Sequence, residues 1–266
     1  MRTVNFPLKA HSVYSMQDNH TPTSPSINIA HVGVHYRTDE ALRDVNCIVK
    51  ASRITGIFGP NGAGKSTLMK AMLGLVPLSS GTVLYEAKPL MQQLEKVAYI
   101  PQRSQIDWTY PATVWDVAMM GRVKKTGWLR SFSAVSRQET KNALKRVEMF
   151  AHCDRPIGEL SGGQQQRVFL ARALAQQADI YCFDEPFVGI DQKTQAVIFA
   201  VFHELAAAGK IVLVVNHDLG ESITHFDDLI LLNRELIATG LRQQVLTKEN
   251  LYRAYNGQVM YFDNAA

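Results

Sequence analysis

The segment 53–75 constrains the fold more than any other part of this 266-residue chain. An apolar run at 53–58 leads into the sequence Gly-Pro-Asn-Gly-Ala-Gly-Lys-Ser at 59–66, and a stretch of helical character follows. This order fits the pattern G-x-x-x-x-G-K-[ST] between a strand and a helix. The glycines allow backbone N–H groups to surround a polyphosphate, and the helix N-terminus adds partial positive charge. The segment therefore predicts a phosphate-binding loop.

Apolar strands alternate with helices along most of the remaining chain. Apolar patterning predicts strands near 27–34, 42–49, 82–85, 97–100, 179–183, 210–216, 229–232 and 236–239. Helices are expected at 65–75, 111–121, 136–151 and 165–175, with another ending near 208, and a capping box at Ser136 and Glu139 opens the third. Apolar strands separated by helices predict an α/β fold in which a parallel sheet is covered on both faces.

Changes in texture along the chain predict its domain boundaries. Residues 1–26 are polar and carry Pro22 and Pro25, so we expect a flexible N-terminal tail. One domain is expected over 27–240, with a core at 27–104 and 156–240 and an inserted helical subdomain at 105–155. Residues 241–266 are expected to form a C-terminal tail.

Composition excludes several classes of protein. Apolar residues make up 46% of the chain and charged residues 20%, which is typical of a globular protein. No apolar run approaches the roughly 18 residues that cross a bilayer, and 1–26 has no apolar core of a secretory signal. The net charge of +4 is spread along the chain, so no nucleic-acid partner is expected. Cys47, Cys153 and Cys182 lie far apart, which favours reduced thiols in a cytosol.

Two carboxylates follow the apolar strand near 179–183. Asp184 and Glu185 stand at its C-terminal end, the edge at which parallel sheets bind ligands. Lys65 would reach the β- and γ-phosphates, and the Ser66 hydroxyl and Asp184 are suited to Mg²⁺. Glu185 is suited to polarising an attacking water. An acidic pair alone is more often a solvated turn, but together with the phosphate loop it indicates nucleotide hydrolysis.

A second anion site is predicted at Leu160-Ser161-Gly162-Gly163-Gln164. This pentapeptide puts a hydroxyl and two amides without side chains at the start of a helix. One chain thus carries two phosphate-binding helix starts but only one loop with a lysine. A single nucleotide would not obviously need both.

With these motifs in this order, the chain resembles the ATP-binding subunit of ABC transporters over about residues 27–240. The resemblance implies a P-loop NTPase core with a mostly parallel sheet, an N-terminal antiparallel β-subdomain and an inserted α-helical subdomain. It identifies the Walker A loop at 59–67, the signature at 160–164, the Walker B pair at 184–185 and the D-loop at 188–191. The D-loop reads Val-Gly-Ile-Asp instead of the commoner Ser-Ala-Leu-Asp.

The resemblance also implies a role for each motif residue, with ATP and Mg²⁺ as cofactors. Catalysis is implied for Glu185, His217, Gln102 and Lys65, and Mg²⁺ binding for Ser66, Gln102 and Asp184. The implied ATP ligands are Tyr36, which matches the aromatic that stacks on adenine, and Gly59, Pro60, Asn61, Gly62, Ala63, Gly64, Lys65, Ser66 and Thr67. A second chain would add Ser161, Gly162, Gly163, Gln164 and Asp191.

Partners and location follow from the same resemblance. It implies a head-to-tail homodimer in which the signature of one chain caps the ATP held by Walker A of the other, which would explain the two phosphate sites. It also implies a peripheral position on the cytoplasmic face of the bacterial inner membrane, against an integral-membrane permease.

Two stretches look like the subfamily that serves manganese, zinc and iron importers. They are 100–122 and 184–191, and the pair Asp107-Trp108 together with 127–130 favours the manganese branch. The expected function is ATP hydrolysis that powers import of a divalent transition metal, manganese in particular, with a metal-binding solute receptor as an indirect partner. An importer for zinc, iron or another solute is the alternative, because this site binds only ATP.

Two functions of other classes stay open. A soluble ABC-type ATPase that acts on DNA would carry long coiled coils between Walker A and signature, and one that acts on ribosomes would carry two cassettes per chain. This chain has one cassette and one helical insert. A P-loop module that binds nucleotide without turnover is disfavoured by the presence of Gln102, Glu185 and His217.

A set of aromatic and apolar residues after Gln102 predicts a docking surface. These residues are Trp108, Tyr110, Trp115, Met119 and Met120. Trp108 and Tyr110 stand in a proline-flanked loop, where large aromatics mark binding surfaces, whereas Trp115 fits the core of the insert equally well. Flexible methionines suit a groove for a partner helix. We expect a cytoplasmic helix of the permease to dock near 102–122.

Overall fold

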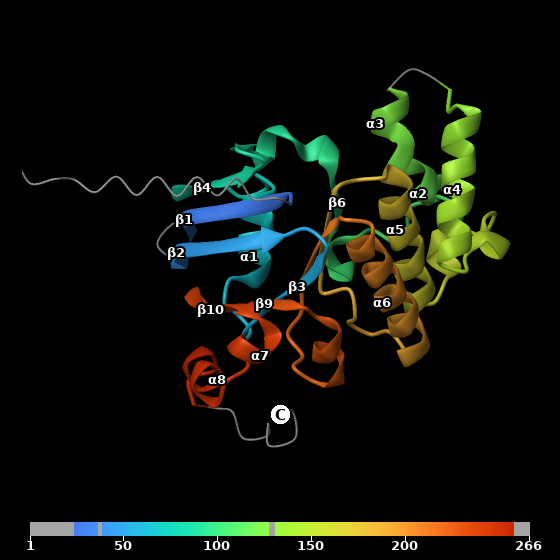
Figure 1. Ribbon diagram of the computed structural model, residues 1–266. Coiled ribbons are helices and arrows are strands. Elements are labelled where there is room, and N and C mark those ends of the chain that lie inside the picture. Colours follow the sequence, from blue (N-terminus) through green and yellow to red (C-terminus); the bar gives the residue numbers. More distant parts are fainter. Residues whose placement is uncertain (1–23, 37–38, 128–130, 258–266) are drawn as a thin grey trace, which may run out of the picture.

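The computed structural model describes residues 24–36, 39–127 and 131–257, which form two sheets with helices around them (Figure 1). The first sheet is antiparallel and has the strand order β2-β1-β4-β5. Its strands are β1 (Ser26–Tyr36), β2 (Asp39–Lys50), β4 (Ser80–Tyr85) and β5 (Lys88–Pro89). Two 3₁₀ turns, η1 (Leu90–Gln92) and η2 (Leu94–Lys96), connect it to the second sheet.

The second sheet has six strands in the order β10-β9-β3-β8-β7-β6. All neighbours are parallel except β10, which pairs antiparallel with β9. The strands are β3 (Arg53–Phe58), β6 (Val97–Ile100), β7 (Ile180–Asp184), β8 (Ile211–Val215), β9 (Asp228–Asn233) and β10 (Glu235–Leu241). Because β3, β6, β7 and β8 run in one direction, the loops that follow them gather at a single edge of the sheet.

Alternating side chains of the central strands enter two hydrophobic cores. Ile57, Cys182 and Leu213 pack with α1 (Lys65–Met72) and the antiparallel sheet. Phe58 and Phe183 point to the other core, which contains α5 (Gly162–Gln176) and α6 (Gln192–Ala207). The parallel sheet is therefore covered on both faces, as its apolar strands predicted.

The region between the two halves of the core is helical. It contains η3 (Arg103–Gln105), α2 (Val114–Met119), η4 (Met120–Arg122), α3 (Val123–Thr126), α4 (Ala134–Arg146), η5 (Phe150–His152) and η6 (Ile157–Glu159). The predicted capping box at Ser136 is wrong, because Ser133 caps α4 by accepting a hydrogen bond from the Ser136 N–H. The helix also ends before Ala151, which is exposed.

The last described residues form α7 (Arg242–Val245) and α8 (Lys248–Ala254), after η7 (Glu221–His225) has joined β8 to β9. Val245, Leu251 and Ala254 are buried in the core that contains α5, so 242–254 differ from the expected tail. The expected tail at 1–26 lies almost wholly outside the described residues. The boundaries at 104 and 156 stay predictions.

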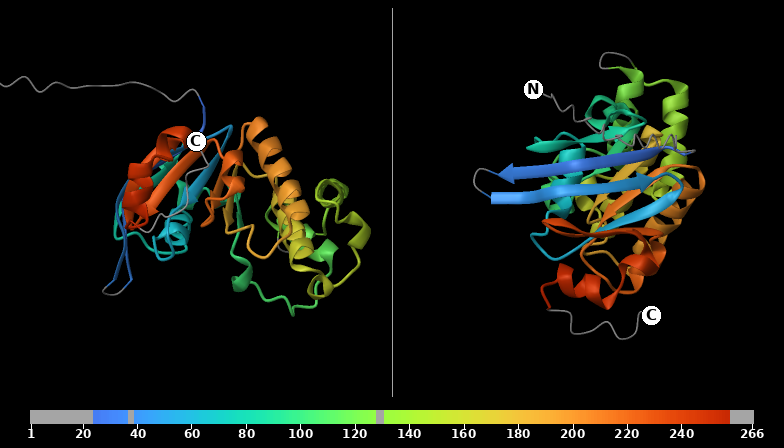
Figure 2. Two further views of the ribbon diagram at one scale, coloured as in Figure 1. Left: turned by 90° about the horizontal axis from the view of Figure 1, so that it is seen from below. Right: turned by 60° about the vertical axis from the view of Figure 1, so that its left-hand side comes forward.

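Figures 1 and 2 show how these parts are arranged. Helices α2, α3 and α4 lie at one end of the molecule, and α7 and α8 lie at the other, beside β10. The expected fold class, a mostly parallel P-loop core with an antiparallel β-subdomain and added helices, is confirmed. No helix within the described ranges is both long and apolar enough to cross a membrane.

Candidate functional site

The loop 59–66 is held tightly between β3 and α1. Gly59 has φ 149° and Gly64 has φ 89°, values that L side chains rarely adopt. A Cβ at Gly59 would lie 2.1 Å from the Leu232 carbonyl oxygen, and one at Gly64 would lie 2.5 Å from Leu42. The glycines therefore let the loop lie directly against β9 and β2, immediately before α1 begins.

The ammonium of Lys65 lies inside this loop. Its Nζ donates hydrogen bonds of 2.8 Å to the carbonyl oxygens of Gly59 and Pro60. Burial lowers the pKa of Lys65, and the carboxylates of Glu185 and Asp184 oppose that shift. The loop thus concentrates a cation and backbone N–H groups where a polyphosphate would bind.

Ser66 and Asp184 meet at the edge of the sheet. The Ser66 hydroxyl donates a 2.7 Å hydrogen bond to Asp184 Oδ1. The Asp184 side chain is buried, and its Oδ2 has no hydrogen-bond partner among the described residues. Burial raises the pKa of Asp184 and Glu185 adds to the rise, while the Ser66 hydrogen bond and Lys70 oppose it. A buried carboxylate with a free oxygen beside a hydroxyl offers the hard oxygen ligands that Mg²⁺ prefers.

Glu185 lies between two polar side chains from neighbouring strands. Gln102 follows β6, and its side-chain amide donates a 2.7 Å hydrogen bond to Glu185 Oε2. His217, which follows β8, has its Nδ1 3.8 Å from Glu185 Oε1. Glu185 itself has φ 51°, a strained conformation for a residue with a side chain, and its N–H donates to the Val215 carbonyl. The structure therefore brings the predicted catalytic residues together.

The signature residues 161–164 form the start of α5. Ser161 accepts a hydrogen bond from the Gln164 N–H, and the Gln164 side chain accepts one from the Ser161 N–H. A Cβ at Gly163 would lie 2.7 Å from Thr194 Oγ1, so α6 approaches this turn closely. Within the described ranges no hydrogen bond joins 161–164 to the loop 59–67. The described part of the signature is instead held by hydrogen bonds within its own helix start.

Two other implied ligands of ATP stand at element ends. Tyr36 closes β1 and is 45% exposed, so its ring is free to stack on a flat ligand. Asp191 caps α6 by accepting a 2.7 Å hydrogen bond from the Thr194 N–H. That hydrogen bond lowers the pKa of Asp191. This intrachain role of Asp191 was not predicted.

The expected docking set is only partly exposed. Tyr110 is 60% exposed and Met120 is 45% exposed. Met119 is buried, and Trp115 packs partly against the main core. Trp108 is half-buried, because its ring packs edge-on against Phe169 at 5.2 Å between centroids, so it offers less surface to a partner than its loop suggested.

Sequence reasoning missed two cations close to the site. Lys70 lies on α1 near Asp184, and its charge partly opposes the rise that burial causes in the pKa of that carboxyl. Arg103 directly follows Gln102, and its side chain reaches α5, where it donates to Gln165. The place of Arg103 beside a predicted site residue could be read from the sequence. The direction in which its side chain points could not.

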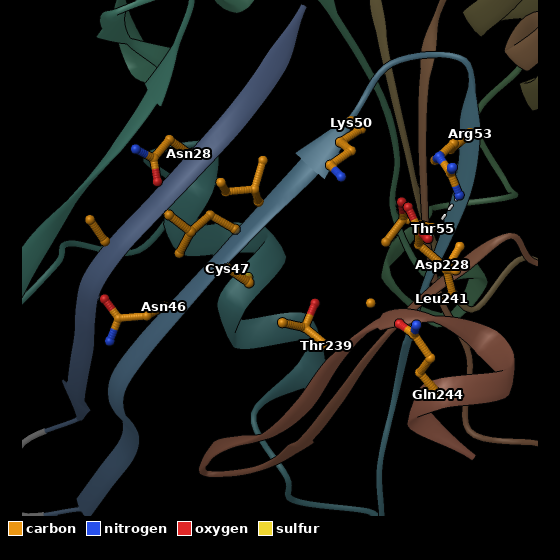
Figure 3. A pocket seen from close by; sticks show the side chains of 14 residues that line it. Asn28, Asn46, Cys47, Lys50, Arg53, Thr55, Asp228, Thr239, Leu241 and Gln244 are labelled. Carbon is orange, nitrogen blue, oxygen red and sulfur yellow. Dashed lines mark hydrogen bonds and ion pairs between the residues drawn. The ribbon is translucent and has the colours of Figure 1, made fainter. Parts of the chain in front are cut away.

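A cavity of about 710 Å³ lies apart from these residues, between the β1–β2 hairpin and the β10–α7 segment (Figure 3). Arg53 and Asp228 form an ion pair of 3.0 Å at its wall. None of the predicted site residues lines it. The nucleotide site is therefore built from loop backbone and strand ends and not from the cavity.

The phosphate loop, the Ser66–Asp184 pair and the polar side chains around Glu185 together define a P-loop ATPase. A family model described as ABC transporter matches residues 42–188. The chain belongs to the ABC transporter family and carries its ATP-binding ATPase domain.

Three known proteins are similar over most of the chain. A probable ABC transporter ATP-binding protein from Cyanophora paradoxa is 47% identical over 225 residues, 85% of this chain and 92% of that protein. A manganese transport system ATP-binding protein from Listeria innocua is 44% identical, covering 89% of this chain and 98% of its own length. A zinc transport system ATP-binding protein from Treponema pallidum is also 44% identical and covers 89% of both chains.

Solved structures agree with this assignment. The ADP conformation of an ATP-binding cassette of an ABC transporter has a TM-score of 0.77 at 25% identity, covering 89% of this chain and 100% of that chain. The dimeric structure of a bacterial ABC transporter cassette has a TM-score of 0.71 at 26% identity, covering 81% of this chain and 98% of that chain.

Proposed function

We propose that this ATPase powers an importer for a divalent transition metal, and that the metal is manganese. The observation that carries the proposal is the 44% identity to the manganese transport system ATP-binding protein of Listeria innocua over 98% of that protein. The zinc relative is equally similar, so zinc is the competing metal. The pair Asp107-Trp108 and the stretch 127–130 favour manganese.

ATP binding is proposed to use the loop 59–67 and Tyr36. Backbone N–H groups of the loop would surround the β- and γ-phosphates, and the Lys65 ammonium would neutralise part of their charge. The exposed ring of Tyr36 would stack on adenine. Burial of Lys65 supports this role, because a cation withdrawn from water gains more from a bound anion.

Mg²⁺ is proposed to bind at Ser66, Asp184 and Gln102. The unpartnered Oδ2 of Asp184 and the adjacent Ser66 hydroxyl support this assignment. When bound, the ion would neutralise phosphate charge. To reach the ion, Gln102 would give up its hydrogen bond to Glu185.

Hydrolysis is proposed to depend on Glu185 as general base for the attacking water. Its carboxylate stands at the end of β7, next to Asp184 and within 3.8 Å of His217. His217 would hold the water and contact the γ-phosphate, and Gln102 would keep Glu185 in place until nucleotide binds.

The active form is proposed to be a head-to-tail homodimer. The signature makes no hydrogen bond to the loop 59–67 of its own chain within the described ranges. This supports the dimer, because the two anion-binding helix starts would then complete one site across two chains. The similar cassette of dimeric structure is further support. In this dimer Ser161, Gly162, Gly163, Gln164 and Asp191 would act on the partner's ATP.

The dimer is proposed to dock on an integral-membrane permease through 102–122, at the cytoplasmic face of the bacterial inner membrane. The exposed side chains of Tyr110 and Met120 support this surface. A metal-binding solute receptor would deliver the metal to the permease from the other side of the membrane.

Metal uptake in the native host tests the proposal. A strain without this chain would be complemented with the wild type or with Glu185→Gln, and uptake of radioactive manganese and zinc would be compared. Manganese uptake restored by the wild type alone supports the proposal. Restored zinc uptake without manganese overturns the choice of metal. Normal uptake of both in the deletion strain, with the chain sedimenting with ribosomes, overturns transport.

A further inference from the structure

We propose that Arg103 is a positioning residue that holds the signature turn of its own chain, and so acts on the ATP bound by the partner. The inference rests on the proposed head-to-tail dimer. Arg103 is joined by one peptide bond to Gln102, whose side chain contacts Glu185 at the chain's own nucleotide site. Two adjacent residues therefore connect one chain's nucleotide site with the helix start that the same chain offers to its partner.

The guanidinium of Arg103 is fixed on the first turn of α5. Its Nη2 and Nε donate hydrogen bonds of 2.8 and 3.2 Å to the side-chain oxygen of Gln165. Gln165 is 3% exposed and donates through its Nε2 to the Ile157 carbonyl at 3.1 Å. A Cβ at Gly162 would lie 3.1 Å from Arg103 Cζ, so the guanidinium also covers the backbone of the signature. Arg103 thus holds the Gln165 side chain, which in turn joins α5 to the segment before the signature.

A second contact secures the backbone of Arg103. Its carbonyl oxygen accepts a 3.1 Å hydrogen bond from Trp108 Nε1, and its guanidinium lies 5.5 Å from the Trp108 ring centroid. The same ring packs against Phe169 on α5. The loop that begins at Gln102 is therefore attached to α5 at two points, Gln165 and Phe169.

The charge of Arg103 has no counter-ion in the part of the chain that the structure describes. Its side-chain hydrogen-bond acceptor is the neutral amide of Gln165, and none of the ion pairs among the described residues includes Arg103. The ordinary explanation is a half-buried arginine that packs a loop. An unpaired cation beside the N-terminus of α5 does more, because it adds to the helix dipole where the partner's phosphate would bind.

Arg103→Ala should lower the turnover of the homodimer about tenfold while ATP affinity stays within about twofold, because its own loop 59–67 is untouched. Gln165→Ala should have a similar effect, and the double variant should be no slower than the worse single variant, because both changes remove one contact. Arg103→Lys should fall between wild type and Arg103→Ala, since it keeps the charge but not the forked donor. Arg137→Ala, an exposed arginine on α4, is the matched control and should leave turnover unchanged.

Mixed dimers separate action on the partner from action within the chain. In a mixture of Arg103→Ala with Lys65→Ala chains, one site combines an intact loop 59–67 with the intact signature of the Lys65→Ala chain. We expect that mixture to match a reference mixture of Ser161→Arg with Lys65→Ala. Mixing the double variant Arg103→Ala/Lys65→Ala with Ser161→Arg should be about tenfold less active, because the only usable signature then lacks Arg103.

The reference mixture distinguishes two kinds of failure. If the reference itself is inactive, the head-to-tail dimer is wrong. If the reference is active and the Arg103→Ala mixture is slow, Arg103 acts on its own nucleotide site and the present proposal is overturned. Should Arg103→Ala melt at a much lower temperature than the wild type, the same mixtures are made with Arg103→Lys, and equal activity of its two mixtures also overturns the proposal.

Discussion

The side-chain amide of Gln102 donates a 2.7 Å hydrogen bond to the carboxylate of Glu185. The two residues follow neighbouring parallel strands, β6 and β7, so the order of the sheet brings them together across 83 positions of sequence. This contact joins the loop that leads into the helical region to the residue proposed as general base.

Glu185→Gln should abolish ATP turnover but not ATP binding. The amide has nearly the same shape as the carboxylate, yet it cannot accept a proton, so the rate should fall at least about 10²-fold. Steady-state phosphate release measures the rate, and size-exclusion chromatography with ATP should show a trapped dimer. Glu95→Gln, an exposed glutamate at η2, is the control. Turnover near the wild-type rate would remove Glu185 from its catalytic role.

Lys65→Ala should weaken nucleotide binding itself. The buried ammonium is the one side-chain cation inside the loop among the described residues, and the phosphates would lose it. We expect ATP affinity to fall at least about tenfold, or about 1.4 kcal/mol, by calorimetry. Lys88→Ala should not change affinity, since Lys88 is exposed on the edge strand β5 and is not among the residues proposed to bind ATP. An unchanged affinity for Lys65→Ala would contradict the phosphate-loop assignment.

Ser161→Arg should block turnover while each chain still binds ATP. A long cation at the start of α5 would occupy the space proposed for the partner's γ-phosphate. Ser161 also caps α5, so the substitution costs about 1 kcal/mol of stability for an unrelated reason. Ser161→Ala loses the same cap without the bulk and is the matched control. Full activity of Ser161→Arg in phosphate-release assays would end the composite-site proposal.

Asp184→Asn should stabilise the protein without nucleotide, and the effect should depend on pH. Burial raises the pKa of Asp184 above its unfolded value, so the ionised carboxylate costs folding free energy at pH values above the folded pKa. That cost is relieved as pH falls through the folded pKa. By differential scanning calorimetry, Tm should rise by roughly 2–4 °C near neutral pH, the shift that about 1 kcal/mol gives a chain of this size.

The Tm difference between Asp184→Asn and the wild type should shrink towards about pH 4, near the ordinary pKa of an aspartate. Asp154→Asn, an exposed aspartate, serves as control and should show no such trend. Added MgATP should raise the Tm of the wild type more than that of Asp184→Asn. A Tm difference that grows as pH falls would contradict the burial argument.

Tyr110→Ala combined with Met120→Ala should weaken docking on the permease. Both side chains are exposed, so their loss should reduce co-purification with the permease about tenfold and lower metal uptake, while basal ATP hydrolysis is spared. Trp108→Ala should instead lower Tm, because that ring packs against Phe169. Tyr252→Ala on α8, at the opposite end of the molecule in Figure 1, is the control. Normal assembly of the double variant would move the docking surface elsewhere.

Local sequence determined much of this protein. Gly59 and Gly64 take backbone conformations and close contacts that other residues cannot, so their spacing before Lys65 was enough to predict the loop. The apolar strand before Asp184 and Glu185 likewise predicted that these carboxylates stand at a sheet edge. Such features depend on neighbours within a few positions, and physical rules for short segments describe them well.

Tertiary structure alone decided the order of strands, and with it which side chains meet. The placement of β7 between β6 and β8 brings Gln102 and His217 to Glu185 from opposite sides. Packing between distant segments also decided the place of Trp108. Its loop suggested exposure, but its ring packs against Phe169 on α5. Arg103 shows the same limit. Its place beside Gln102 was readable, but its contact with Gln165 spans 62 positions and depends on how two distant segments pack.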